Sequence, residues 1–168
     1  MGITRRHVLA GCVGVCGLAI VGGGAVAVVT APAPGAALLS TRELLIVRAL
    51  AEVMFPADPF PIDGVEAGVP EEVDRILSDM LAPLHANGFR AILHLLEWGT
   101  AASRGTPFSQ LSVDLRREVL ATWADPEVFT RRVADDAFRL VLGMAYFQHP
   151  RVLEHMGWSL GCVGRGEG

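Results

Sequence analysis

The sequence predicts an all-α protein, a compact domain of five or six helices preceded by a signal helix of the twin-arginine (Tat) type. After residue 37, apolar residues recur at three- and four-residue intervals, and no segment shows the strict alternation that is typical of half-buried strands. Prolines and glycines separate these periodic segments. Residues 8–29 form instead one uncharged apolar run, which follows Arg5 and Arg6.

The N-terminus has the three parts of an export signal. Arg5 and Arg6 supply the positive region, residues 8–29 the apolar region, and Ala25-Val26-Ala27 a small-residue cleavage site. Adjacent arginines indicate the bacterial Tat route, which carries folded proteins. We therefore expect residues 1–37 to be a signal peptide or anchor plus a Pro/Ala linker. Residues 38–168 would be a helical domain in the periplasm or on the outer face of the membrane.

The leader has two other interpretations, a retained membrane anchor and a lipidation signal. The apolar run has about the ~20 residues that a membrane-spanning helix needs, so a retained anchor and membrane association stay open. Its six glycines weaken such a helix, which favours cleavage. Leu9 to Cys12 spells a lipobox, but it precedes most of the apolar run, which argues against lipidation of Cys12.

Composition limits the partners and the chemistry. The loss of Arg5 and Arg6 lowers the basic residues from 14 to 12 against 18 acids, a net charge of −6 that disfavours nucleic acid. The chain has no lysine, which excludes lysine-based catalysis. Only Cys162 would remain after cleavage, so no disulfide within the chain is expected.

The first expected helix spans residues 40–54. Ser40 and Glu43 form the S-x-x-E pattern of a capping box, and apolar residues follow at helical spacing up to Met54. The helix ends before Pro56, and residues 56–70 are dense in Pro, Gly and Asp. This composition predicts a long loop, which in a compact domain is often functional.

The second expected helix spans residues 70–81. Pro70 suits a first helical turn, acids follow it, and apolar residues then recur on one face. Pro83 interrupts the pattern. The remaining helices are bounded by Gly105, by Ser112 as a cap and by His149-Pro150, and we expect them at residues 89–102, 111–123, 125–147 and 150–156.

Few patterns point to catalysis or metal binding. His94 and Glu97 place two ligand types on one helix face, but a di-metal bundle would need Glu-x-x-His motifs from two helices. The chain contains no G-x-S-x-G motif, and its glycine run lies in the leader rather than after a strand. No catalytic, cofactor-binding or metal-binding residue is therefore assigned.

Three segments, in this order after the twin-arginine leader, resemble one known family. They are MFPADPFPIDGVEAGVPEEVDRIL (residues 54–77), PFSQLS (107–112) and FQHPRVLEHMGW (147–158). Together they are similar to the gluconate 2-dehydrogenase subunit 3 family. The matching positions are Pro56, Asp58, Ala67, Gly68, Val69, Pro70, Asp74, His149, Pro150, Gly157 and Trp158. After Trp158 the chain departs from the usual family ending.

The resemblance implies a non-catalytic accessory subunit of an oxidoreductase complex. Family members are small Tat-exported subunits of membrane-associated sugar and sugar-acid dehydrogenases. Their large subunit is an FAD protein of the glucose-methanol-choline (GMC) type, and a cytochrome c subunit often accepts the electrons. The implied partners are thus this flavoprotein, possible cytochrome c and the Tat translocon, and FAD would be held by the flavoprotein.

A candidate partner interface follows from the loop and the C-terminal motif. Phe55, Phe60 and Ile62 put large apolar groups on a loop, where a partner could bury them, although in a lone domain they would fold back on the core. The candidate residues are Phe55, Pro56, Phe60, Ile62, Gly68, Val69, Pro70, His149, Pro150 and Trp158. The alternatives are a stand-alone periplasmic helical binding protein and, last, a metalloenzyme using His94 and Glu97.

Overall fold

A computed structural model describes residues 31–125 and 127–158, and within them the protein is all-helical. The described part holds six α-helices and one 3-10 helix, with no strand, which confirms the predicted all-α fold. The predicted signal helix with Arg5 and Arg6, and Cys162, lie outside the described residues. The elements are α3 (Thr41–Met54), α4 (Val69–Asp79), α5 (Pro83–Arg104), η1 (Phe108–Gln110), α6 (Val113–Trp123), α7 (Phe129–Phe147) and α8 (Pro150–His155).

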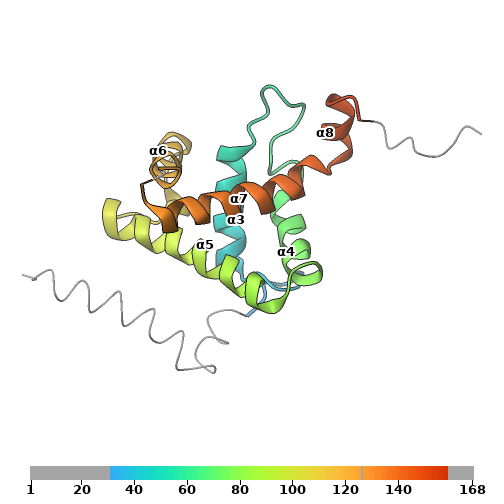
Figure 1. Cartoon of the computed structure of the whole chain (residues 1–168). Helices are drawn as coiled ribbons and strands as arrows, with labels where there is room; N and C mark the ends of the chain where they lie inside the picture. The colour runs from blue at the N-terminus through green and yellow to red at the C-terminus, as the bar shows by residue number, and fades with distance from the viewer. Residues whose placement is uncertain (1–30, 126, 159–168) are drawn as a thin grey trace, which may run out of the picture.

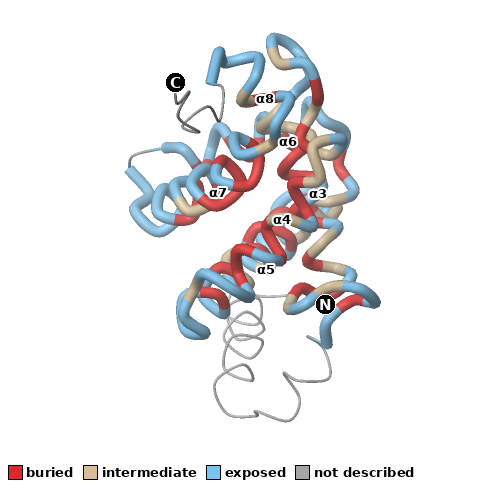
Figure 2. Tube along the Cα trace, turned by 90° about the vertical axis from the view of Figure 1, so that its right-hand side faces the viewer, coloured by how far each residue is buried: buried red, intermediate tan, exposed pale blue. Residues whose placement is uncertain are grey.

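Helix α3 lies at the centre of the bundle. It packs against α4, α5, α6 and η1. Helix α7 packs against α4 and α6, passes in front of α3 in Figure 1 and continues toward α8. The buried positions gather where α3, α4, α5 and the inner side of α7 meet (Figure 2). Within the described residues, no helix is both long enough and apolar enough to cross a bilayer.

Two helix starts predicted from the sequence are confirmed with their caps. Ser40 and Glu43 form both hydrogen bonds of the capping box that begins α3. The Ser112 hydroxyl accepts a hydrogen bond from the Leu115 N–H at the start of α6. Both side chains satisfy backbone N–H groups that have no partner within the helix.

Two other helix starts were wrong. Helix α5 begins at Pro83, not at residue 89, because Pro83 occupies the first turn, where a helix does not need the N–H that proline lacks. Helix α7 begins at Phe129, not at residue 125. The Asp125 carboxylate accepts the Glu127 N–H and the Asp125 carbonyl accepts the Val128 N–H, so this segment forms a turn before the helix.

Asp74 on α4 ties down the segment that leads into α3. Its buried carboxylate accepts the backbone N–H groups of Ala37, Leu38 and Leu39 at 2.6, 2.9 and 2.6 Å. Hydrogen bonds to a carboxylate are stronger than those between neutral groups, and here they offset the cost of burying the charge. The side chain of Leu39 is fully buried. The point where the chain enters the domain is therefore fixed from inside the fold.

A second buried carboxylate, that of Glu43, joins α3 to α5. Oε1 lies 2.8 Å from Arg90 Nε and 3.2 Å from His94 Nε2, while Oε2 accepts the Ser40 N–H and hydroxyl, both at 2.7 Å. Burial by itself raises the pKa of Glu43, but the hydrogen bonds from His94, Arg90 and Ser40 outweigh it and lower the pKa to about 2. Glu43 is therefore ionised inside the protein.

This pKa shift predicts how stability depends on pH. Because the pKa of Glu43 is lowered from 4.5 to about 2 on folding, its contribution is complete above about pH 4.5 and is lost as the pH falls toward 2. The contribution is on the order of 3 kcal/mol. We expect Glu43→Gln to unfold more easily in urea at pH 7, and the difference from the wild type to shrink between pH 4.5 and pH 2.

Glu118→Gln is the matched control, because Glu118 forms a surface ion pair with Arg104 and is 62% exposed. It should change the free energy of unfolding little at either pH. A constant difference between wild type and Glu43→Gln across this pH range would show that the Glu43 charge does not stabilise the fold.

Candidate partner interface

The Pro/Gly loop between α3 and α4 folds back onto α7. The Phe55 ring stacks on Tyr146 with centroids 4.4 Å apart, and Phe60 meets the same ring edge-on at 5.7 Å. Phe147 contacts both phenylalanines with centroids 5.9 Å away, and His155 of α8 lies 5.5 Å from Phe60. We call Phe55, Phe60, Tyr146 and Phe147 the aromatic cluster. It leaves Phe55 and Phe60 half-buried rather than extended toward solvent.

Hydrogen bonds hold the loop in this position. The buried Tyr146 hydroxyl donates to the Ile62 carbonyl at 2.7 Å, and Asp63 Oδ1 accepts the N–H groups of Val65 and Glu66. Burial of the Tyr146 hydroxyl raises its pKa, and the negative charge of Asp63 adds to this. Tyr146 therefore stays a neutral hydrogen-bond donor, and the loop has a fixed shape.

Gly64 allows the loop to approach α3, a role that the sequence reading missed. A Cβ atom at this position would lie 2.8 Å from the Ala51 carbonyl oxygen and 3.1 Å from Ala51 Cβ. Both neighbours belong to the central helix, so they cannot move aside easily. The only sequence signal was a glycine in a turn-rich segment, and that pattern does not say which helix the loop will meet.

Four of the ten predicted interface residues serve this chain's own structure. Ile62, Val69 and Pro70 are buried in the core, so their side chains do not reach the surface. Gly68 is the N-cap of α4 and has a φ of +71°, a backbone conformation that glycine adopts without strain. These four residues place the loop and begin the next helix.

The other predicted residues lie at or near the surface. Pro56 and Pro150 are exposed and Trp158 is 72% exposed. His149 is half-buried as the N-cap residue of α8, and among the described residues its Nδ1 has no hydrogen-bond partner. With the outer edges of Phe55 and Phe60, these side chains are the part of the predicted set that another chain could contact.

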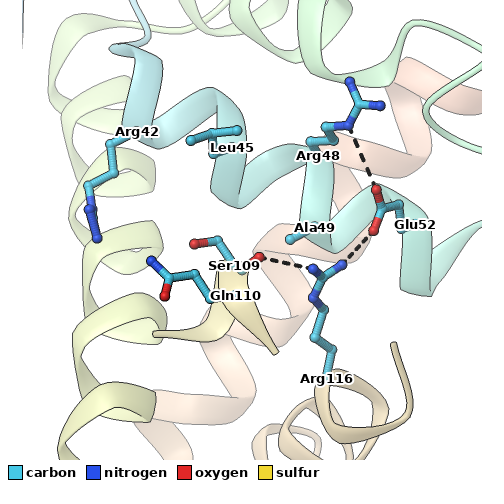
Figure 3. A pocket seen from close by; sticks show the side chains of 8 residues that line it. All are labelled: Arg42, Leu45, Arg48, Ala49, Glu52, Ser109, Gln110 and Arg116. Atoms are coloured by element: carbon cyan, nitrogen blue, oxygen red, sulfur yellow. Dashed lines mark hydrogen bonds and ion pairs between the residues drawn. The ribbon is translucent and has the colours of Figure 1, made fainter. Parts of the chain in front are cut away.

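A hollow of about 360 Å³ lies between α3, η1 and α6 (Figure 3). Its charged groups mostly pair with each other: Arg116 donates to Glu52 at 2.5 Å and to the Ser109 carbonyl at 2.9 Å, and Arg48 lies 3.7 Å from Glu52. The hollow thus contains an ion-pair network that braces three elements. Its lining residues are Arg42, Leu45, Arg48, Ala49, Glu52, Ser109, Gln110 and Arg116.

The two side chains considered as metal ligands have separate partners. His94 contacts Glu43, whereas the buried Glu97 accepts the Ser109 N–H at 2.9 Å and hydroxyl at 2.7 Å and lies 3.5 Å from Arg42. Within residues 31–125 and 127–158, no group of three or more His, Cys, Asp or Glu side chains comes together to hold a metal ion. Glu97 therefore anchors η1 to α5.

Comparison with known families decides the relationship. A family model described as gluconate 2-dehydrogenase subunit 3 matches residues 41–164. The chain belongs to this family. The match begins at the first residue of α3 and includes every described helix, so the resemblance drawn from the sequence motifs is confirmed. No curated protein and no solved structure matches the chain.

The family name describes one subunit of a multi-subunit dehydrogenase, which fits an accessory role. Among the positions on which the resemblance was drawn, Gly68, Val69 and Pro70 lie at the start of α4, and Asp74 holds the entry segment. These motif residues therefore stabilise the fold around the Pro/Gly loop. The exposed residues near them, such as Pro56, Pro150 and Trp158, are the better candidates for contact with another subunit.

The close approach of Gly64 to α3 gives a test of this loop. Gly64→Ala should lower the free energy of unfolding by about 1–3 kcal/mol, because the added methyl group meets the Ala51 backbone. Gly88→Ala is the matched control: Gly88 lies within α5 with no atom near its added Cβ, so this change should be neutral or stabilising by up to about 1 kcal/mol. Urea unfolding gives the free energy of unfolding of both variants and of the wild type. If Gly64→Ala is as stable as the wild type, the loop is not closely packed against α3.

Proposed function

We propose that this chain is the non-catalytic small subunit of an exported FAD-dependent dehydrogenase. The observation that carries the proposal is the family match over residues 41–164. The large subunit would be a GMC-type flavoprotein that oxidises a sugar, a sugar acid or an alcohol, and a cytochrome c subunit could receive the electrons. Substrate choice would belong to the flavoprotein.

The twin-arginine leader gives the subunit a second role. A flavoprotein takes up FAD in the cytoplasm and must then cross the membrane folded, which the Tat route permits. If the flavoprotein lacks its own signal, Arg5 and Arg6 on this chain would direct the pair across. The helical domain would bind and stabilise the large subunit in the periplasm or at the outer face of the membrane.

We place FAD in the large subunit rather than in this chain. The hollow at Arg116 is lined by guanidinium and carboxylate groups that already pair with each other. It also lacks the glycine-rich turn before a helix N-terminus that binds a pyrophosphate group.

Affinity purification from the native envelope fraction tests the complex. The tagged chain should elute with a larger protein in about equal amount, and the eluate should be yellow with the absorbance of bound flavin. A colourless monomer would contradict the proposal and would favour the alternative, a stand-alone periplasmic helical binding protein.

Replacement of the leader arginines tests the escort role. Arg5→Lys combined with Arg6→Lys should leave both this chain and the flavoprotein in the cytoplasm, measured by fractionation and by dehydrogenase activity in the periplasm. Arg117→Lys, an exposed arginine on α6, is the control and should not change export. Normal export of the flavoprotein beside the double variant would show that it does not depend on this leader.

A further inference from the structure

Helix α7 carries a second apolar face, opposite to the one that it buries in the core. Large apolar side chains point outward along its whole length and are between 40% and 69% exposed. They follow each other at spacings of four, seven, four and three residues. We call these five residues the outer stripe: Phe129, Val133, Leu140, Met144 and Phe147.

Helical geometry places the outer stripe on a single line. At 100° per residue, the five residues fall within an arc of roughly 60°. Phe138, Leu142 and Ala145 fall on the opposite side and are buried. A surface helix normally has polar residues on its outer face, and a helix that is apolar all round is normally covered. Among residues 31–125 and 127–158, no helix therefore packs over this face of α7.

The figures agree with this geometry. Figure 1 shows α7 passing in front of α3, and Figure 2 shows it at the edge of the molecule with exposed positions on its outer side. Within the described residues, α7 packs against α4, α6 and α8. None of these helices covers the outer stripe, whose five members are all exposed.

The size of the stripe fits a subunit interface. A helix of 19 residues is about 28 Å long, and five half-exposed large side chains offer on the order of 400 Å² of apolar surface. Apolar patches of this size on a protein surface are often functional. With a surrounding polar rim, the face approaches the roughly 800 Å² per partner of a standard interface.

Charges along one edge of the stripe indicate the chemistry of the partner. Arg132 and Arg139 flank the same side, and both are exposed. Arg139 pairs with Asp135 of its own helix at 2.7 Å, whereas Arg132 forms no ion pair with another described residue. Asp136 also lies at this edge, so the edge is mixed but carries two arginines. A partner with an apolar groove bordered by acidic side chains would complement it.

The stripe is continuous with the candidate interface at the C-terminal end of α7. Phe147 is both the last residue of the stripe and a member of the aromatic cluster, where it contacts Phe55 and Phe60. Beyond it, Trp158 is exposed as well. One surface thus runs along α7 to the Pro/Gly loop and the C-terminal motif.

We propose that the outer stripe is the surface on which the large flavoprotein subunit docks, with an apolar groove over the stripe and acidic side chains against Arg132 and Arg139. This proposal rests on the proposed function, because it takes the partner from there. It goes further by placing the contact along α7, where only Phe147 belongs to a motif segment that the sequence singled out.

Affinity capture of the flavoprotein by the full chain tests the docking face. Leu140→Glu puts a charge at the middle of the stripe and should lower the captured flavin at least about tenfold. Leu84→Glu is the matched control, because Leu84 is an 80% exposed leucine at the start of α5. It should capture flavin at the wild-type level. Circular dichroism and thermal unfolding must show that both variants fold as the wild type does.

A second variant keeps the test valid if Leu140→Glu does not fold. Arg132→Glu changes one exposed charge that forms no ion pair with another described residue, and it should weaken capture and reduce its dependence on salt concentration. Wild-type capture by both variants would overturn the docking proposal while the proposed function stands. If the wild-type chain itself captures no flavoprotein, the proposed function has failed first.

Two other occupants of the stripe would give different results in these experiments. If Leu140→Glu abolishes self-association in light scattering but captures flavoprotein normally, a second copy of this chain covers the stripe. If it changes only the protection of residues 1–37 from protease, the leader of the same chain covers it. Either result overturns the proposal that the flavoprotein docks there.

Discussion

The buried carboxylate of Glu43 is the interaction on which the rest of the fold depends. One side chain caps α3 through Ser40 and reaches Arg90 and His94 on α5, so it fixes both the start of the central helix and its angle to the longest helix. Hydrogen bonds from Ser40, Arg90 and His94 compensate the charge. A buried carboxylate without such partners would be too costly to keep, so α3 and α5 must meet in this one register.

Buried polar side chains hold three other segments to helices in a similar way. Asp74 holds the entry segment by three backbone N–H groups, and Glu97 holds η1 through Ser109. The Tyr146 hydroxyl holds the Pro/Gly loop through the Ile62 carbonyl. Each of these three segments is held by a polar side chain that projects from a helix, which leaves the outer faces of the helices free for other contacts. The described part of the protein is thus a rigid scaffold with paired charges inside it.

This arrangement is consistent with the accessory role that the family name suggests. The titratable groups at its centre are committed to hydrogen bonds, while large apolar side chains occupy the outer face of α7. In a single isolated domain such a face would be a liability, because exposed apolar patches promote association. The family name implies a multi-subunit dehydrogenase complex, and the proposed docking of the large subunit would cover this face.

The sequence by itself determined the helical class, the caps at Ser40 and Ser112 and the family, because these depend on local spacing and on motif order. It misplaced the starts of α5 and α7, since a proline or an aspartate can begin a helix or stand before one. Only the tertiary structure decided that Glu43 pairs with α5, that Ile62 and Val69 are buried, and that α7 exposes Leu140. These features depend on which helices become neighbours, and residues 40 or more positions apart carry no periodic signal of their contact.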